Sequence, residues 1–205
     1  EADAGLNTGG MGAVSPLPFV TTDFMQKVKD RIIEPTIAGL KKDNLVYRGF
    51  IFLGLMNDNG EPKVIEYNCR LGDPETEVVI PRIKNDLVEL FLATAEQRLH
   101  EIKIETDERA VATVVAVSGG YPGDYEKGKI ISGLQDPTLD DSIVFHSGTK
   151  KIGDDIVTNG GRVLAVTSYG GNIAEAVELS NYILEQLDFE GMYYRSDIGF
   201  EFSFQ

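Results

Sequence analysis

The sequence is poor in the residues that build several common kinds of site. Among 205 residues it has one cysteine, Cys69, and two histidines, His100 and His146. A single cysteine excludes an intrachain disulfide and a multi-cysteine zinc site. Two histidines supply a histidine metal site or a Ser-His-Asp triad poorly, so we expect both to be surface or packing residues. Without a disulfide framework, the expected compartment is the cytoplasm.

Basic residues are also scarce. Lys and Arg number 19 against 33 Asp and Glu, which gives a formal net charge of -14. This acidity argues against nucleic acid and anionic membrane surfaces as partners, because both attract basic proteins. No apolar run approaches the ~18 residues that a membrane-spanning helix needs. With 42% hydrophobic and 25% charged residues, the chain has the composition of a globular protein with a packed core.

The first part of the chain predicts a loop followed by a helix. Residues 1–20 are rich in glycine and proline and are expected to form a loop. A helical pattern begins after Thr21, a plausible N-cap. Pro35 is expected to end or kink this helix, with a second short piece continuing to about Lys42.

Two strands and another helix are expected next. Residues 46–56 are almost continuously apolar, which suits a strand covered on both faces. Asn-Asp-Asn-Gly at residues 57–60 is a hairpin turn signal. The returning strand, residues 63–71, alternates between apolar and polar side chains, with Cys69 on the apolar face as a small buried residue. A helix is expected to begin at Asp86.

The charged, irregular segment at residues 101–108 is expected to link two domains, residues 1–100 and residues 109–205. After it, short β-like runs are separated by turns rich in Gly and Asn. A closing helix begins at Asn172, where Glu175 completes a capping box. The expected strands are residues 111–117, 129–132, 143–145 and 162–167. The expected fold class is α+β, with a small, mainly-β second domain.

The polar face of the strand at residues 63–71 is the most informative feature. Residues two apart share a strand face, so Glu66 and Asn68 present a carboxylate and an amide oxygen side by side. Hard oxygen ligands of this kind suit Mg²⁺, which completes its shell with water and phosphate oxygens. Arg70 follows on the same face, where its guanidinium can hold a phosphate or a carboxylate. The alternative is a solvated strand face, but this row runs straight into Gly-Asp-Pro-Glu at residues 72–75, which is more typical of a site.

A glycine-rich segment near the start is the second candidate site. Glycines at this density let backbone N–H groups approach an anion closely. The segment contains neither the Gly-Lys-Ser/Thr of a P-loop nor a Gly-x-Gly-x-x-Gly fingerprint. On its residues alone it is as typical of a plain turn as of a ligand loop. It consists of Asn7, Thr8, Gly9, Gly10, Met11 and Gly12.

Four stretches of the chain, taken in order, resemble one known family. They are residues 7–13, 65–76, 119–125 and 158–163. They resemble the glycinamide ribonucleotide synthetase family, also called phosphoribosylamine–glycine ligases, and the resemblance extends over essentially the whole chain. The family motif commonly reads Arg-Phe-Gly-Asp-Pro-Glu-x-Gln, whereas here Leu71 replaces the Phe and Glu77 the Gln. Leu6 stands where Pro usually precedes Asn-Thr-Gly-Gly.

The resemblance implies an ATP-grasp fold. Residues 1–100 would be the second half of the ATP-grasp module, and residues 109–205 the family's C-terminal domain. An N-terminal portion of the same protein, including the first ATP-grasp subdomain, would then be missing from this sequence. We therefore expect this chain alone to have negligible ligase activity.

The resemblance also implies the reaction and the site residues. Phosphoribosylamine and glycine would be joined in purine synthesis, with ATP as co-substrate and Mg²⁺ or Mn²⁺ as cofactor. Glu66 and Asn68 match the metal pair, and Arg70 and Asp73 match the catalytic motif that faces the substrates. The glycine-rich segment and Glu75 would bind substrate. The strand before this one, residues 49–56, carries no acid, so the metal shell is expected to be thinner than in many ATP-grasp enzymes.

Two other functions are compatible with these residues. An ATP-grasp ligase could use another acceptor, although the motif at residues 70–75 disfavours it. The chain could also be a non-catalytic module that contributes interfaces inside a larger assembly.

Overall fold

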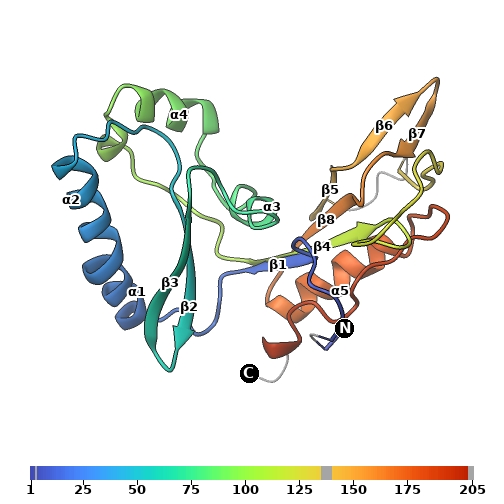
Figure 1. Ribbon diagram of the computed structural model, residues 1–205, viewed down its shortest axis with the longest axis horizontal. Coiled ribbons are helices and arrows are strands. Elements are labelled where there is room, and N and C mark those ends of the chain that lie inside the picture. Colours follow the sequence, from blue (N-terminus) through green and yellow to red (C-terminus); the bar gives the residue numbers. More distant parts are fainter. Residues whose placement is uncertain (3, 135–139, 203–205) are drawn as a thin grey trace. The chain divides into compact units, whose positions relative to one another are not determined.

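The computed structural model describes residues 1–2, 4–134 and 140–202, which form two compact units (Figure 1). The first unit contains Glu1–Pro16, Asp73–Arg82 and the residues from Asp107 onward. The second unit contains Leu17–Gly72 and Ile83–Thr106. Each unit is therefore assembled from segments that are separate in the sequence. The assignment of residues 1–100, 101–108 and 109–205 to the family's domains stays a prediction.

The first unit is built on a four-stranded antiparallel sheet in the order β1-β4-β8-β5. Its strands are β1 (Gly12–Ser15), β4 (Ala110–Val117), β5 (Ser142–His146) and β8 (Arg162–Gly170). Every residue of β4 is buried, as an apolar strand with neighbours on both sides requires. The sequence predicts three of these strands. It does not predict β1, which lies in the expected loop and pairs with a strand about one hundred residues away.

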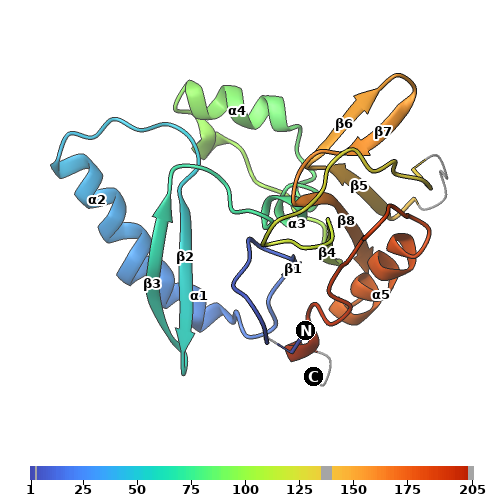
Figure 2. The same ribbon diagram turned by 45° about the vertical axis from the view of Figure 1, so that its right-hand side comes forward.

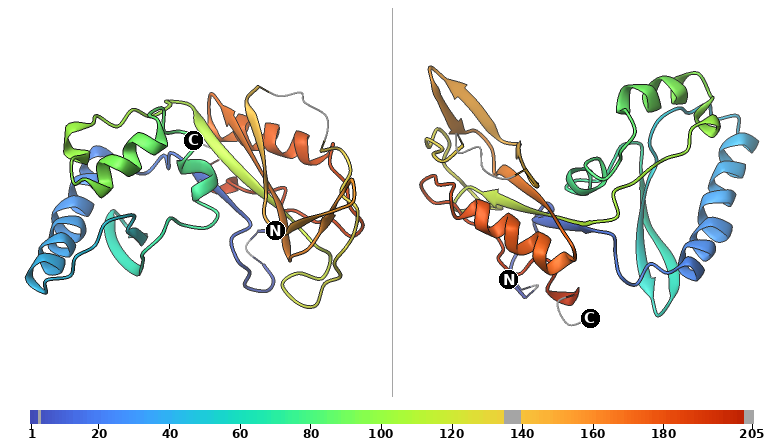
Figure 3. Two further views of the ribbon diagram at one scale, coloured as in Figure 1. Left: turned by 90° about the horizontal axis from the view of Figure 1, so that it is seen from above. Right: turned by 180° about the vertical axis from the view of Figure 1, so that it is seen from behind.

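Helix α5 (Ile173–Leu184) packs against β4 and β8 and closes the core of this unit (Figure 3). Its predicted start is confirmed, since the Asn172 side chain accepts a hydrogen bond from the Glu175 N–H at 3.0 Å. Leu184 is fully buried with Val114, Val166 and neighbouring apolar residues. This burial, rather than the helix's intrinsic propensity, holds the helix on the sheet.

Smaller elements complete the first unit. Strands β6 (Thr149–Ile152) and β7 (Asp155–Thr158) form a hairpin that the sequence does not predict (Figure 2). The strand expected at residues 129–132 is wrong, because only isolated bridges form there, from Ile130 to Val157 and from Ser132 to Asp188. The short helix α3 (Thr76–Val79) and the 3-10 turn η3 (Phe200–Phe202) also belong to this unit.

In the second unit, the helix predicted after Thr21 continues past Pro35 instead of ending there. Helix α1 (Thr22–Val28) passes through a π-helical turn, η1 (Lys29–Ile33), into α2 (Glu34–Lys42). Pro35 lies at the start of α2 and has no backbone N–H to donate. The widened turn just before the proline accommodates it, so the helix continues.

A β-hairpin lies beside these helices in the second unit. Strand β2 (Phe52–Asp58) pairs with β3 (Glu61–Asn68), and α1 contacts β3 (Figure 1). The predicted turn is confirmed: Asn59 and Gly60 have φ of 53° and 86°, the positive values that a two-residue hairpin turn of this type needs. The pairing shifts between Gly54 and Leu55, so one residue of β3 bulges out of register.

Two expectations about this hairpin are wrong. Residues 46–51 are not a strand, and Val46 is 88% exposed rather than covered on both faces. Among the described residues, this sheet consists of β2 and β3 alone, so no further strand covers residues 46–51. Cys69 is exposed rather than buried, because β3 ends at Asn68 and leaves it outside the paired strand.

The remaining helix of the second unit is α4 (Leu87–Ala95), followed by the 3-10 turn η2 (Leu99–Glu101). The predicted cap is confirmed, since Asp86 accepts a hydrogen bond from the Glu89 N–H at 3.0 Å. Part of the segment expected as a linker is paired: the Lys84 N–H donates to the Glu105 carbonyl at 2.9 Å. Among the described helices, none has the length and apolar character needed to cross a bilayer.

Candidate functional site

The predicted site residues divide between the two units. The glycine-rich segment, Asp73 and Glu75 belong to the first unit. Glu66, Asn68 and Arg70 belong to the second unit. Each unit therefore carries one part of the candidate site.

In the first unit, the glycine-rich segment is anchored at its C-terminal end. Met11 is 8% exposed and its side chain packs with Val115 and Val117 of β4. The Met11 carbonyl accepts a hydrogen bond from the Val115 N–H at 2.9 Å, and Gly12 begins β1. Asn7, Thr8 and Gly9 are exposed. The segment is thus a loop fixed at one end by a buried strand, with Met11 serving as an anchor.

The loop approaches the Asp73-Pro74 segment closely at Gly10. A Cβ atom added at Gly10 would lie 2.1 Å from Pro74 Cδ and 3.1 Å from the Asp73 carbonyl oxygen. Real Cβ atoms do not approach other atoms so closely, so glycine is required here for steric reasons. The next residue back, Gly9, donates its N–H to the Tyr121 hydroxyl at 3.0 Å. Two of the predicted site segments therefore touch within one unit.

Arg162 joins these two segments. Its Nη1 donates to Asp73 Oδ1 at 2.8 Å and to the Gly10 carbonyl at 3.2 Å, and its Nη2 donates to Asp73 Oδ2. The hydrogen bonds to the Asp73 carboxylate raise the pKa of the guanidinium above its ordinary value. A guanidinium that holds both oxygens of one carboxylate is a strong and directional ion pair. Residues 10, 73 and 162 thus form one hydrogen-bonded cluster.

Two further acids lie on α3 or just before it. Glu75 is the residue before α3 and is half-buried. Burial raises the pKa of Glu77, and the negative charges of Asp73 and Glu75 act in the same direction, against the lowering effect of Arg162. The Glu77 Oε2 atom is buried and has no hydrogen-bond partner among the residues that the structure describes. The Glu77 carboxyl group therefore binds a proton more tightly than an exposed carboxyl group does.

A pocket of about 540 Å³ opens beside the loop in the first unit. Asn7, Thr8 and Met11 line it together with Tyr121 and Arg195. The Arg195 guanidinium is ion-paired with Asp197 at 2.8 Å, and Glu1 also lines the pocket. The lining therefore suits a small polar ligand and does not by itself select for a negative charge.

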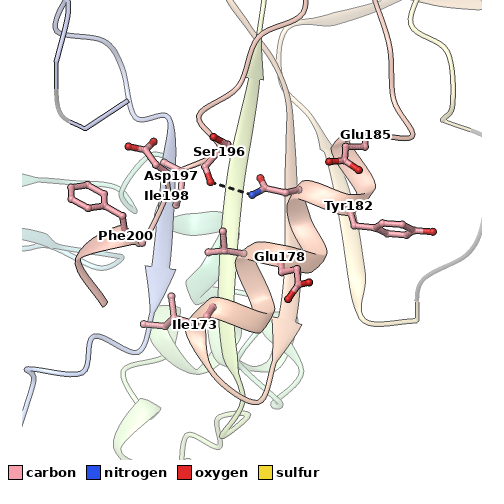
Figure 4. Close-up of a pocket in the computed structure, with 12 residues that line it drawn as sticks. Ile173, Glu178, Tyr182, Glu185, Ser196, Asp197, Ile198 and Phe200 are labelled. Atoms are coloured by element: carbon pink, nitrogen blue, oxygen red, sulfur yellow. Dashed lines mark hydrogen bonds between the residues drawn. The ribbon is translucent and has the colours of Figure 1, made fainter. Parts of the chain in front are cut away.

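A second pocket, of about 450 Å³, lies between α5 and residues 196–200 (Figure 4). Asn181 donates its Nδ2 to the Ser196 carbonyl at 3.3 Å across it. The carboxylates of Glu178 and Glu185 are on its helix side. None of its lining residues belongs to the predicted site.

In the second unit, the predicted pair Glu66 and Asn68 is side by side. Asn68 Nδ2 donates to Glu66 Oε1 at 2.9 Å, which confirms that the two side chains share a face of β3. Glu66 is paired with Gly54 on β2, where an added Cβ would lie 2.9 Å from Glu66 Cγ. Gly54 therefore leaves the space that the Glu66 side chain occupies.

Arg70 is not the third member of this strand row. Strand β3 ends at Asn68, and the exposed Arg70 donates its Nη1 to the Leu71 carbonyl at 2.8 Å. The alternation that predicts Arg70 on the strand face stops where the pairing with β2 stops. The Arg70 side chain is therefore carried by a loop, and it remains near the pair along the chain.

The oxygen atoms of Glu66 and Asn68 fit a Mg²⁺ or Mn²⁺ ion in kind, because both cations prefer hard oxygen ligands. In the part of the chain that the structure describes, no group of three or more His, Cys, Asp or Glu side chains could hold a metal. An ion at this pair would therefore take most of its ligands from water or phosphate, as Mg²⁺ commonly does.

The chain matches two family models in succession. Residues 1–76 match the phosphoribosylglycinamide synthetase ATP-grasp (A) domain, and residues 111–201 match the C domain of the same synthetase. The chain belongs to the phosphoribosylglycinamide synthetase family. This is the family that the four motifs resemble, under its other name, so both that prediction and the α+β, ATP-grasp fold class are confirmed.

Individual relatives of the synthetase family agree with this assignment. The chain is 49% identical to phosphoribosylamine–glycine ligases of Chlorobaculum tepidum and of Escherichia coli O157:H7, over 97% of the chain and 47% of each relative. The crystal structure of the ligase from Thermotoga maritima has a TM-score of 0.82 and 35% identity, covering 96% of this chain and 48% of that one. The chain thus spans about half the length of the curated relatives it matches.

More distant structures share only the fold of the synthetase family. The Kluyveromyces lactis urea carboxylase has a TM-score of 0.66 at 18% identity, over 92% of this chain and 16% of that one.

The sequence assigns no role to Tyr121 or Arg162, two residues that contact the glycine-rich loop. Both lie in stretches that carry the family resemblance, at residues 119–125 and 158–163, and this position is the one sequence feature that marks them. Neither spacing nor composition reveals that these stretches meet the glycine-rich loop, because Arg162 and Asp73 are 89 residues apart in the sequence.

Proposed function

We propose that this chain is part of a phosphoribosylamine–glycine ligase and supplies the second half of its ATP-grasp module and its C-terminal domain. The observation that carries the proposal is the 49% identity to ligases of this name over 97% of the chain. The expected compartment stays the cytoplasm, a prediction that rests on the single cysteine.

The proposed reaction has two steps. A carboxylate oxygen of glycine attacks the γ-phosphorus of ATP, the bond from that phosphorus to the leaving oxygen of ADP breaks, and glycyl phosphate forms. The amine of phosphoribosylamine then attacks the glycyl carbonyl carbon, phosphate leaves, and the nitrogen loses a proton. Neither step needs a protein nucleophile, since most of the catalysis of phosphoryl transfer comes from positioning and charge stabilisation.

Residues of the second unit would serve the phosphoryl transfer. Glu66 and Asn68 would hold Mg²⁺ or Mn²⁺, which when bound neutralises charge on the ATP phosphates. Arg70 would contact a phosphate or the glycine carboxylate with its exposed guanidinium. These roles are supported by the 2.9 Å contact between Glu66 and Asn68 and by the match of residues 65–76 to the family motif.

Residues of the first unit would bind the two substrates that are joined. Asn7 and Thr8 line a pocket of about 540 Å³ together with Tyr121, whose hydroxyl accepts a hydrogen bond from the Gly9 N–H. Asp73 and Glu75 would complete this half of the site. The phosphate of phosphoribosylamine and the carboxylate of glycine would be bound in this half of the site.

Two other functions remain as alternatives with different outcomes. An ATP-grasp enzyme with another acceptor would keep the metal pair and change the substrate loop. A non-catalytic interaction module would need neither. We favour the ligase because Asp73 and the glycine-rich loop, both parts of the family's motifs, meet in one hydrogen-bonded cluster.

The test is ADP release by the full-length protein that contains this chain, with Mg-ATP, glycine and freshly made phosphoribosylamine. The proposal predicts turnover that requires both glycine and phosphoribosylamine. ATP binding without turnover of these substrates, or ADP release that needs a different acceptor, would support the first alternative. The absence of both ATP binding and ADP release would support the second. The 205-residue chain alone is expected to release negligible ADP, because it spans about half the length of the ligases it matches.

A further inference from the structure

We propose that Arg162 is a positioning residue of the ligase, and that Asp73 acts through it rather than on the substrates directly. The inference rests on the proposed function and deepens it. It assigns a role to residues 158–163, one of the four stretches that resemble the family, and it revises the role of Asp73 that the family motif implies.

The first argument is how the Asp73 carboxylate is used. Both of its oxygens accept hydrogen bonds from the Arg162 guanidinium, Oδ1 at 2.8 Å from Nη1 and Oδ2 from Nη2. A carboxylate that accepts from both arms of a guanidinium fixes the plane and direction of that guanidinium. Asp73 is therefore suited to orient Arg162.

The second argument is what Arg162 does with its remaining hydrogen-bonding capacity. The same Nη1 donates to the Gly10 carbonyl at 3.2 Å. This contact ties the glycine-rich loop to the Asp73-Pro74 segment, which the missing side chain of Gly10 already lets approach closely. The Arg162 side chain is 25% exposed and the Asp73 side chain is 53% exposed, so the pair is open to water on the Asp73 side. Its role is therefore to fix geometry rather than to supply a large electrostatic energy.

The third argument is that Tyr121 holds Gly9, the residue before Gly10, by a second hydrogen bond. The Tyr121 hydroxyl accepts a hydrogen bond from the Gly9 N–H at 3.0 Å. The ring of Tyr121 lies against Gly161, where an added Cβ would be 2.3 Å from Tyr121 Cδ2. Gly161 directly precedes Arg162 in the chain. Tyr121 and Arg162 thus hold two consecutive glycines of the loop.

These contacts fix the backbone of the loop where it would meet the substrates. Positioning of this kind acts on the rate, since a displacement of about 1 Å can reduce it ~100-fold. A lysine at position 162 would keep the charge but lose the planar fork that contacts Asp73 and Gly10 together.

The kinetic test uses Arg162→Ala, Arg162→Lys, Asp73→Ala and the double variant in the full-length protein. We expect Arg162→Ala to lower kcat about 10-fold to 100-fold in assays varying glycine or phosphoribosylamine. The KM for ATP should stay within about twofold, because Arg162 and Asp73 belong to the first unit, whereas the proposed metal ligands Glu66 and Asn68 belong to the second. Arg162→Lys should recover little of the loss. The double variant should be no worse than either single variant, since the two residues act as one unit.

Arg109→Ala is the matched control. Arg109 also makes a forked ion pair, with Asp107 at 2.9 Å, and a second pair with Asp141 at 2.6 Å. It precedes β4 at the end opposite Val117, the residue that pairs with Arg162. Its loss should leave the kinetics of all three substrates unchanged.

Three results would overturn the inference. Wild-type kinetics in Arg162→Ala would remove any positioning role. Effects of Arg162→Ala and Asp73→Ala that multiply in the double variant would mean that Asp73 contacts the substrates itself. An equal loss in Arg109→Ala would mean that the fold, rather than the loop, responds to any lost ion pair.

Hydrogen exchange of the full-length protein separates a failure of the inference from a failure of the proposed function. Arg162→Ala should reduce amide protection at Gly9, whose N–H donates to the Tyr121 hydroxyl, because the loop is no longer tied at the neighbouring Gly10 carbonyl. Protection of β4 and β8 should be retained. This measurement needs no substrate, so it remains decisive even if the wild-type protein shows no ligase activity. Unchanged protection of Gly9 would contradict the inference.

Discussion

The two units differ in how firmly their part of the candidate site is held. In the first unit, the glycine-rich loop is continuous with β1, which pairs with a completely buried strand, and Arg162 and Tyr121 hold two of its glycines by hydrogen bonds. In the second unit, the candidate metal pair, Glu66 and Asn68, lies on a two-stranded hairpin on which Ile65 and Tyr67 are 62% and 52% exposed. An isolated hairpin is only marginally stable in water. The glycine-rich loop is therefore held firmly by contacts within the first unit. The hairpin that carries Glu66 and Asn68 is held by few contacts within the second unit.

The largest expected effect tests this difference through catalysis. In the full-length protein, Glu66→Ala should lower kcat by about 100-fold or more, because a metal ligand stabilises several kcal/mol of transition-state charge. Lys63→Ala, on the same strand and exposed, should have little effect. Steady-state kinetics at saturating Mg²⁺ measure both. Equal and mild effects would remove the metal role of Glu66.

The next prediction tests the difference through stability. Leu184 of α5 is completely buried in the first unit, whereas Leu92 of α4 is 52% exposed in the second. Leu184→Ala should reduce the free energy of unfolding by about 2–5 kcal/mol, since it removes apolar contacts and leaves a cavity. Leu92→Ala should cost less than about 1 kcal/mol. Urea unfolding followed by circular dichroism would show this, and similar losses in both variants would contradict the comparison.

Glycine substitutions sharpen the comparison further. Gly10→Ala places a Cβ 2.1 Å from Pro74 Cδ, so the loop must move away from the Asp73-Pro74 segment. We expect a loss of about 10-fold in kcat/KM for glycine and phosphoribosylamine in the full-length protein.

Gly39 is the matched position in the second unit. An added Cβ there meets nothing within 4 Å, and the residue lies within α2. Gly39→Ala should therefore raise stability by about 0.5–1 kcal/mol and leave the kinetics unchanged. Wild-type kinetics in Gly10→Ala, or a loss of activity in Gly39→Ala, would be incompatible with the two steric environments.

The smallest expected effect concerns Glu77. Burial raises the pKa of its carboxyl group above 4.5, so the folded state prefers the protonated form. Its favourable contribution is present at acid pH, below the pKa of the unfolded chain, and is lost as the pH rises through the folded-state pKa. Glu77→Gln should therefore be more stable than wild type near pH 7 and no more stable near pH 4. Thermal unfolding across this range measures it, and a difference that is constant with pH would rule out the assigned cause.

Features that depend on neighbouring residues could be predicted from the sequence. The helix starts at Asp86 and Asn172 and the turn at Asn59-Gly60 were predicted correctly, because a capping side chain or a positive φ is a local requirement. The adjacency of Glu66 and Asn68 was predictable for the same reason, since a strand alternates its faces.

Features that depend on distant partners could not be predicted. The residues of β1 have the composition of a loop, and they form a strand because they pair with β4. The strands of the hairpin β6–β7 are short and show too little alternation of apolar and polar residues to be predicted. The apolar composition of residues 46–51 predicts a buried strand, because apolar side chains are usually covered by other elements. Among the described residues, no strand of this sheet covers them, and the stretch is exposed. The Arg162–Asp73 pair joins two motifs that were recognised separately, and only the folded chain brings them together.

In the proposed reaction, a phosphoryl group passes from ATP to the carboxylate of glycine. Glycine labelled with oxygen-18 in its carboxylate tests it directly, in the full-length protein with ATP and phosphoribosylamine. Glycyl phosphate formation predicts that the released phosphate carries one labelled oxygen for each product molecule. Unlabelled phosphate, with product still formed, would contradict the claim.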